Sequence, residues 1–201
     1  MTNIVGYVLA GGQSHRMGKD KALLPWGEKT LLDHALSRLR EAASRAPAIL
    51  SGPEPRYADR GVPVFPDVVA EAGALGGVLT GLERLPPDAD FGLFLAVDLP
   101  LVPVALLRHL ASRALAGIEA VVAFSPSGPE PLCAVYARTA KDAVRRSVEA
   151  GELKMTSFWR EICVHALYAP AVTEFGDPKA LFRNLNTPAE YQALRPPPPP
   201  T

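Results

Sequence analysis

Short, unbroken apolar runs alternate with segments of helical spacing, and this alternation constrains the fold more than any other feature. IVGYVL (4–9) and FGLFLAV (91–97) are apolar at nearly every position, as expected for strands buried on both faces. TLLDHALSRLREAASRA (30–46) carries apolar residues at 32, 35, 36 and 39, a helical spacing. Buried strands that alternate with helices predict βαβ units and a parallel sheet. Further predicted elements up to residue 124 are strands at 48–50, 62–65 and 120–124 and helices at 75–85 and 104–115.

The pattern becomes less regular after residue 124. LCAVYA (132–137) and CVHALYA (163–169) read as strands on either side of one helical segment at 139–151. We therefore predict an α/β fold with a mostly parallel mixed sheet, formed by a single domain over residues 1–194. RPPPPPT (195–201) is predicted to be an extended, disordered tail, because consecutive prolines donate no backbone hydrogen bonds.

The composition argues against several classes of partner. The 201 residues contain 21 Lys plus Arg and 21 Asp plus Glu, so no net charge attracts nucleic acid or an anionic membrane. The apolar runs are too short for a membrane span, and no secretory leader pattern opens the sequence. Cys133 and Cys163 lack metal-site spacing and are expected to be buried thiols. We expect a cytoplasmic protein.

The loop after the first strand, LAGGQSHRMGKDK (9–21), has the features of a polyphosphate site. Gly11 and Gly12 lack a Cβ, so a ligand can approach their backbone N–H groups closely. Arg16 can bind phosphate through two parallel hydrogen bonds, and Lys19 and Lys21 add positive charge. In open parallel sheets, ligands bind beyond the carboxyl ends of the strands, which is where this loop begins.

Two familiar phosphate-binding motifs do not fit this loop. A Walker A motif needs four residues between its first Gly and Gly-Lys, whereas five separate Gly12 from Gly18–Lys19, and Asp20 replaces the required Ser or Thr. The spacing of GGQSHRMG also differs from the dinucleotide-binding fingerprint GxGxxG. The spacing therefore excludes a P-loop GTPase.

Two carboxylates follow predicted strands. Asp98 ends the second buried strand and is expected to lie at the same sheet edge as the glycine loop. One Asp together with phosphate oxygens and water commonly holds Mg²⁺, so Asp98 is the candidate metal ligand. Asp67, at the end of VPVFPD, is either a turn residue or a further ligand.

Together, LAGGQSHRMGKDKALL (9–24) and AVDLPLV (96–102) resemble the molybdenum cofactor guanylyltransferases, the MobA family. That family begins with the pattern LAGGxSxRMGxDKxLL, which this sequence fits without a gap. The resemblance extends from residue 3 to about 194. Further segments similar to family motifs are VFPDVVAEAGALGG (64–77), EPLCAVY (130–136), GELKMTSFW (151–159) and LFRNLNTPAEY (181–191).

This resemblance implies a fold and an activity. The fold is a three-layer, Rossmann-like fold of the GT-A nucleotidyltransferase type, with a nucleotide-binding half over 1–124 and an acceptor-binding half over 125–194. The activity is Mg²⁺-dependent transfer of GMP from GTP to the terminal phosphate of molybdopterin, with release of pyrophosphate. Separately from the resemblance, we expect a monomer, and because molybdopterin is labile we expect transient contacts with molybdopterin synthesis or acceptor enzymes.

The resemblance also assigns roles to individual residues. Lys21 and Asp98 would act in catalysis together with Arg16, and Asp98 would hold the metal. The residues implied on the acceptor side are Gly77, Asn184 and Asn186. Those implied in nucleotide binding are Leu9, Ala10, Gly11, Gly12, Lys21, Asp67 and Asp98.

The sequence departs from the family at two places. SGPEP (51–55) stands where the family often carries an Asn, and Ala74 replaces the usual Pro of a GPLxG loop. The first departure leaves a base or ribose contact unassigned. Two related activities therefore stay open, namely cytidylyl transfer and transfer to a sugar phosphate. A non-catalytic, nucleotide-binding regulator is the alternative from another class.

Overall fold

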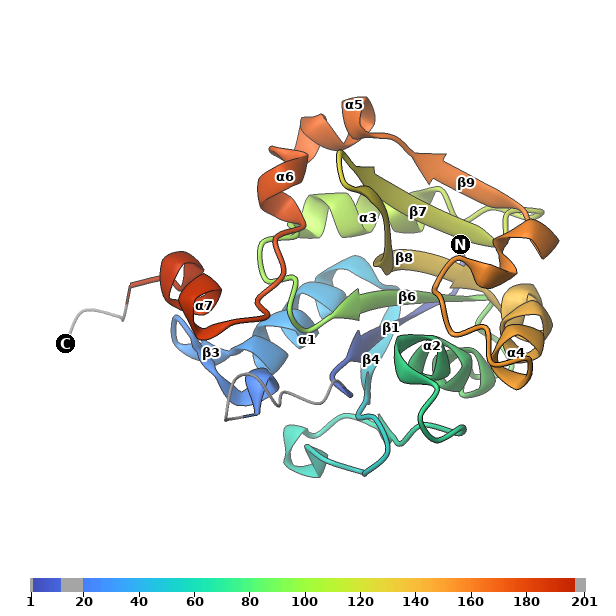
Figure 1. Ribbon diagram of the computed structural model, residues 1–201, viewed down its shortest axis with the longest axis horizontal. Coiled ribbons are helices and arrows are strands. Elements are labelled where there is room, and N and C mark those ends of the chain that lie inside the picture. The colour runs from blue at the N-terminus through green and yellow to red at the C-terminus, as the bar shows by residue number, and fades with distance from the viewer. Residues whose placement is uncertain (1, 12–19, 198–201) are drawn as a thin grey trace.

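The computed structural model describes residues 2–11 and 20–197 and shows a seven-stranded sheet with helices on both faces (Figure 1). In spatial order the strands are β5, β4, β1, β6, β8, β7 and β9. β8 runs antiparallel to both neighbours, and the other pairs are parallel, which confirms the predicted mostly parallel mixed sheet. The strand bounds are Ile4–Leu9 (β1), Arg45–Leu50 (β4), Val64–Phe65 (β5), Phe91–Ala96 (β6), Ala120–Ser125 (β7), Gly128–Ala137 (β8) and Val164–Leu167 (β9).

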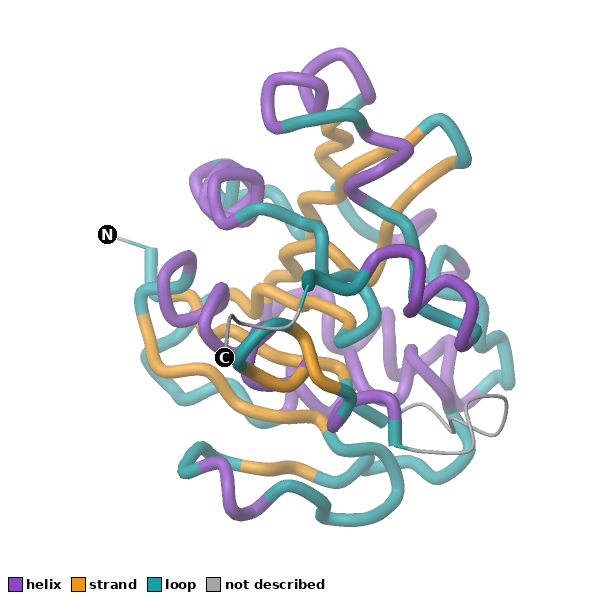
Figure 2. The backbone as a smooth tube through the Cα atoms, turned by 90° about the vertical axis from the view of Figure 1, so that its left-hand side faces the viewer, coloured by secondary structure: helices purple, strands orange, loops and turns teal. Residues whose placement is uncertain are grey.

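The helices form the outer two of three layers (Figure 2). α1 (Leu31–Ala42) and α3 (Val104–Ser112) pack together on one face, and α2 (Gly73–Glu83) and α4 (Lys141–Glu149) pack together on the other. This arrangement confirms the three-layer α/β prediction. The remaining elements are α5 (Ala169–Val172), α6 (Pro178–Leu181), α7 (Pro188–Leu194), a hairpin of β2 (Pro25–Trp26) and β3 (Lys29–Thr30), and 3₁₀ turns η1 (Lys21–Leu23), η2 (Ala58–Arg60), η3 (Arg138–Ala140), η4 (Ser157–Glu161) and η5 (Thr173–Phe175).

The central strand β6 explains why the sheet needs cover on both faces. Leu93 and Leu95 are fully buried in the cluster that includes α1 and α3, whereas Phe94 is buried in the cluster that includes α2. The Phe94 ring stacks on Tyr7 of β1 at 5.2 Å and meets Tyr136 of β8 edge-on at 5.7 Å. Aromatic pairs of this kind add to the free energy gained from burial, so they reinforce the pairing of the three central strands.

Helix α1 is shorter than predicted. Its N-terminus agrees with the sequence, since the Thr30 hydroxyl accepts a hydrogen bond from the Asp33 N–H at 3.1 Å. The helix ends at Ala42 rather than residue 46, because Ala43 adopts an extended backbone with ψ of 154°. Strand β4 consequently begins at Arg45, three residues before the predicted strand.

Strand β8 is longer than predicted. It begins at Gly128, where it pairs with Ser125 of β7, rather than at residue 132. Two prolines at 129 and 131 hid this extension, because proline in a sequence normally argues against a strand.

The two cysteines differ in exposure. Cys133 on β8 is buried as expected, but Cys163 is exposed, so that part of the expectation is wrong. Cys163 directly precedes β9, the outermost strand of the sheet, where one side faces solvent.

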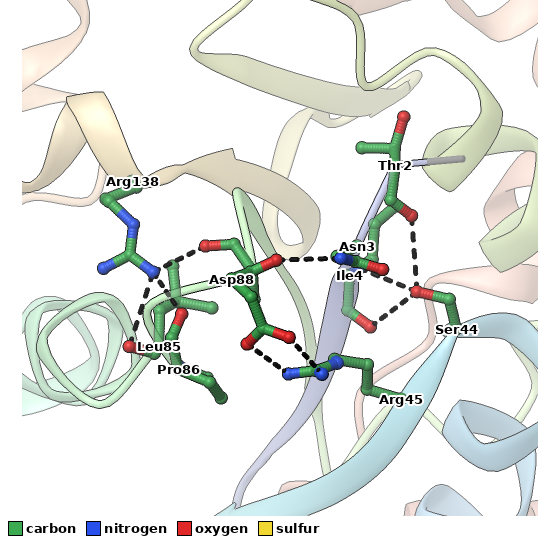
Figure 3. Close-up of polar contacts among 10 residues, drawn as sticks. Thr2, Asn3, Ile4, Ser44, Arg45, Leu85, Pro86, Asp88 and Arg138 are labelled. Carbon is green, nitrogen blue, oxygen red and sulfur yellow. Dashed lines mark hydrogen bonds and ion pairs between the residues drawn. The ribbon is translucent and has the colours of Figure 1, made fainter.

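The amino-terminal edge of the sheet is held by polar contacts (Figure 3). Arg45 at the start of β4 forms a two-pronged ion pair with Asp88, with nitrogen–oxygen distances of 2.7 and 2.5 Å. Asn3 donates a hydrogen bond to the Asp88 backbone carbonyl at 2.8 Å, and the Ser44 hydroxyl accepts one from the Ile4 N–H at 2.8 Å. These bonds join β1 and β4 to the turn that precedes β6.

Arg138 fixes the same turn from the other side (Figure 3). One of its Nη atoms donates to the backbone carbonyls of Leu85, Pro86 and Ala89. A guanidinium that serves several carbonyls at once closes the turn between α2 and β6.

Within the described ranges, no helix combines the length and apolar character that a bilayer span requires.

The proline-rich tail was predicted for 195–201, and its last four residues lie outside the described part.

We predict that Arg138→Ala lowers the free energy of unfolding by about 2 kcal/mol, because it leaves three partly buried carbonyls without their charged donor. Equilibrium urea unfolding measures this loss. Arg40→Ala is the control, since Arg40 is exposed on α1, and it should change stability by no more than about 0.5 kcal/mol. Equal losses in the two variants would contradict the structural role of Arg138.

Candidate active site

A cavity of about 610 Å³ opens at the carboxyl edge of the parallel strands. Leu9, Ala10 and Gly11 reach it from the end of β1, and Asp98 reaches it from the end of β6. Its volume is in the range usual for small-molecule sites. Ligands of open α/β sheets bind at this edge, so the cavity is the candidate active site. Its other lining residues are Asp20, Lys21, Ala22, Leu50, Pro53, Asp67, Ala70, Glu71, Gly73, Ala74, Gly77, Ala96, Val97 and Leu132.

Helix α2 forms one wall of the cavity, and a glycine lets it come close. A Cβ on Gly77 would lie 2.7 Å from Cδ2 of Leu9 and 3.9 Å from Oδ1 of Asp67. Asp67 is half-buried here, and burial raises the pKa of its carboxyl group. Glu71, just before the helix, has a left-handed backbone with φ of 58°, which is costly for a residue other than glycine.

Two glycines bring the loops after β1 and β4 into backbone contact. A Cβ on Gly11 would lie 2.6 Å from the Gly52 Cα, and a Cβ on Gly52 would lie 2.8 Å from the Gly11 Cα. Gly52 also has a left-handed φ of 80°. The Gly52 carbonyl then accepts a hydrogen bond from the Asp67 N–H at 2.7 Å. This contact fixes the backbone of Gly11, which lines the cavity.

Two of the lining residues form an ion pair. The Lys21 ammonium lies 3.0 Å from Oδ2 of Asp98, and these side chains are 15% and 21% exposed. Lys21 also donates to the Asn186 amide oxygen at 3.2 Å. The Leu185 N–H donates to the Asp98 backbone carbonyl at 3.0 Å, so the segment before α7 is joined to both partners of the pair.

Asp20 holds the segment that carries Lys21. Its Oδ1 accepts from the Ala22 N–H at 3.1 Å and so caps the turn η1. Its Oδ2 accepts from the Tyr57 hydroxyl at 2.8 Å and from Arg56 at 3.3 Å. Arg56 also donates to the backbone carbonyls of Ala10 and Ser51. This network ties the cation-bearing segment to the loop after β4.

Sequence reasoning missed Arg56 and Tyr57. Their side chains bind Asp20, more than thirty positions away, and no local sequence pattern predicts such a contact. The one available signal was the unusual SGPEP stretch that precedes them.

The structure brings most of the predicted site residues together. All of those it describes on the nucleotide side line the cavity, as does Gly77. Asn186 contacts Lys21, but both Asn184 and Asn186 are exposed and neither lines the cavity. Gly12 and Arg16 lie outside the described residues. The binding and catalytic roles assigned to these residues stay predictions.

Comparison with known proteins agrees with this fold. The family described as MobA-like NTP transferase domain matches residues 6–165. The chain is 30% identical to a molybdenum cofactor guanylyltransferase from Shewanella woodyi over 190 residues, which is 93% of each protein. A solved structure of molybdopterin-guanine dinucleotide biosynthesis protein A from Archaeoglobus fulgidus has a TM-score of 0.79 and 22% identity, over 94% of this chain and 95% of that one. A Mycobacterium tuberculosis protein solved with manganese has a TM-score of 0.62 and 26% identity, over 83% and 88% of the two chains.

We predict that Gly52→Ala destabilises the protein more than Gly61→Ala. Both glycines have a left-handed backbone, so each substitution should cost about 1 kcal/mol in strain. A Cβ at Gly61 meets nothing within 4 Å, whereas a Cβ at Gly52 meets the Gly11 backbone, which should add about 1–3 kcal/mol. Urea unfolding of the two variants gives the difference directly, and indistinguishable midpoints would argue against the backbone contact.

Proposed function

This chain belongs to the MobA-like NTP transferase family, and we propose that it transfers GMP from GTP to the terminal phosphate of molybdopterin. The products would be the guanine dinucleotide form of the cofactor and pyrophosphate. One observation carries the proposal: Gly11, Lys21 and Asp98 of the family motifs line a single cavity at the carboxyl edge of the sheet.

In the proposed reaction, a terminal phosphate oxygen of molybdopterin attacks the α-phosphorus of GTP. The bond between the α-phosphorus and its bridging oxygen breaks, and pyrophosphate leaves with the electron pair. A phosphomonoester is largely dianionic at neutral pH, with a second pKa of about 6, so no general base is needed. The described site accordingly needs no catalytic histidine.

The main barrier is electrostatic, because two anions must approach within bonding distance. Two unit charges 4 Å apart repel by ~1 kcal/mol in water and by ~4 kcal/mol at a protein-like dielectric constant. Lys21 can offset charge on the α-phosphate and on the departing pyrophosphate, and Arg16 would add a second cation. Leu9, Ala10 and Gly11 line the cavity, and their backbone would hold guanine and ribose and so fix the donor for in-line attack.

The residues of the cavity fit a divalent cation that arrives with the nucleotide. Four carboxylates line the cavity (Asp20, Asp67, Glu71 and Asp98), so a triphosphate would be repelled without a compensating positive charge. Among the described residues, no group of three or more His, Cys, Asp or Glu side chains could hold a metal ion. Asp98 offers two oxygens, and Lys21 contacts one of them.

One carboxylate plus phosphate oxygens and water is a common Mg²⁺ site, so we propose Asp98 as the protein ligand of Mg²⁺. When bound, the ion would neutralise charge on the donor phosphates. We further propose that molybdopterin lies on the side of Gly77, Asn184 and Asn186, and that a cytoplasmic monomer carries out the reaction.

A substrate matrix tests this function. The protein is incubated with Mg²⁺, each of the four nucleoside triphosphates, and either molybdopterin or a sugar 1-phosphate, and pyrophosphate release is measured. We expect release with GTP and molybdopterin. Release with CTP, or with a sugar phosphate, would replace the proposal by one of the related activities. Nucleotide binding without release from any pair would indicate a regulator.

We predict that Lys21→Ala lowers kcat about 10²-fold, the scale expected on removing one donor that stabilises developing negative charge. Lys29→Ala is the control, because Lys29 is exposed on β3 and donates to Ser37 instead.

Asp98→Ala should lose metal-dependent turnover. Wild-type rates for either variant at saturating Mg²⁺ and nucleotide would disprove its assigned role.

A further inference from the structure

The loop that follows Asp98 is held by two side chains of helix α1. One Nη atom of Arg38 donates to the backbone carbonyls of Leu99 at 3.0 Å and Val102 at 2.5 Å. His34 Nε2 lies 3.0 Å from the Pro100 carbonyl oxygen. Since a carbonyl can only accept, Nε2 carries the hydrogen. Arg38 and His34 are four residues apart, so they project from the same face of the helix.

Arg38 is an unusual residue for its position. It is 6% exposed, whereas the other buried residues of α1 are all Leu or Ala, and burial lowers its pKa to about 10, so it stays charged at neutral pH. Its Nε and Nη2 atoms have no hydrogen-bond partner in the described ranges. The nearby Cys133 thiol cannot balance the charge, because burial raises its pKa to about 12.

A buried charge with incomplete hydrogen bonding costs stability, and an apolar side chain of similar size would avoid that cost. Residues that break a local rule in this way tend to serve a site. The contacts of Arg38 indicate which site, because both of its acceptors lie within four residues of Asp98. The Asp98 carbonyl is bound by Leu185 N–H, so the loop is held at its start and along its length.

We propose that Arg38 and His34 are positioning residues that hold residues 98–102 in the conformation that presents the Asp98 carboxylate to Lys21 and to the cation of the nucleotide. The inference rests on the proposed function, since it concerns the same nucleotide and cation. It adds that helix α1, which contributes no residue to the cavity lining, controls the metal dependence of nucleotide binding.

Calorimetric titration with GTP, with and without Mg²⁺, tests this role separately from turnover. The ratio of the two dissociation constants measures how strongly Mg²⁺ and GTP are coupled. Arg38→Met should reduce this coupling about 10-fold, the lower end of what loss of a partner that orients a metal ligand usually costs. GTP affinity without Mg²⁺ should be unchanged. Arg108→Met is the matched control, because Arg108 is an exposed helical arginine that also donates to a backbone carbonyl, that of Glu41.

A double-mutant cycle distinguishes positioning from general support of the fold. If Arg38 acts through Asp98, adding Arg38→Met to Asp98→Asn should cause no further loss of coupling. An additional loss in the Asp98→Asn background, or weaker GTP binding without Mg²⁺, would show a merely structural role and overturn the inference.

The histidine provides a second route if Arg38→Met fails to fold. His34→Leu removes one bond and should reduce the coupling in the same direction, whereas His34→Gln can still donate and should restore it in part. Unchanged coupling in His34→Leu and in any folded Arg38 variant overturns the inference but leaves the proposed function intact. Absence of GTP binding by the wild-type protein with Mg²⁺ would overturn both.

Discussion

The in-register parallel pairing of β1 with β6 is the constraint on which the site depends. Leu9 lies opposite Ala96, so both strands end at the same edge, and the chain enters the glycine loop from one and reaches Asp98 from the other. The pairing is secured by apolar cover on both faces, since Val8 and Leu95 are buried on one side and Tyr7 and Phe94 on the other. The packing of the core thus fixes the distance between Gly11, which follows β1, and Asp98, which follows β6.

Charge is arranged at this edge so that the site holds its shape before a ligand arrives. Lys21 and Asp98 neutralise one another, and Asn186 accepts from the same ammonium. Under the proposed function, a divalent cation bound to the Asp98 carboxylate would compete with Lys21 for it, and a phosphate oxygen would then replace that carboxylate beside the ammonium. Such a site would favour a nucleotide–metal complex over either component alone, because the cation would bind Asp98 while the triphosphate binds Lys21.

The sequence predicted those parts of the structure that depend on local pattern. Continuous apolar runs identified β1 and β6, and the spacing at 32, 35, 36 and 39 identified α1. The same patterns placed Lys21 and Asp98 at a common edge, and the cavity contains both. Contacts between distant segments could not be predicted in this way. The bonds of Asp20 to Arg56 and Tyr57, and those of Arg38 to the loop after β6, join residues 36 or more positions apart. The prolines of β8 hid the first residues of that strand for the opposite reason, because a local rule was overridden by pairing with β7.

Two arginines make the same kind of contact, hydrogen bonds from a guanidinium to backbone carbonyls, at opposite edges of the sheet. Arg138 binds three carbonyls at the amino-terminal edge, far along the strands from the cavity, where a fixed turn benefits the fold (Figure 3). Arg38 binds two carbonyls at the carboxyl edge, but in a more buried setting and with two nitrogen atoms that lack a partner among the described residues. An apolar side chain at this position would give a more stable protein. Arg38 instead binds the Leu99 carbonyl, which belongs to the residue directly after Asp98. Arg38 is therefore more buried than Arg138, and of the two only Arg38 has buried nitrogen atoms without a hydrogen-bond partner in the described ranges. On this ground we assign the contacts of Arg138 to the stability of the fold and those of Arg38 to the site.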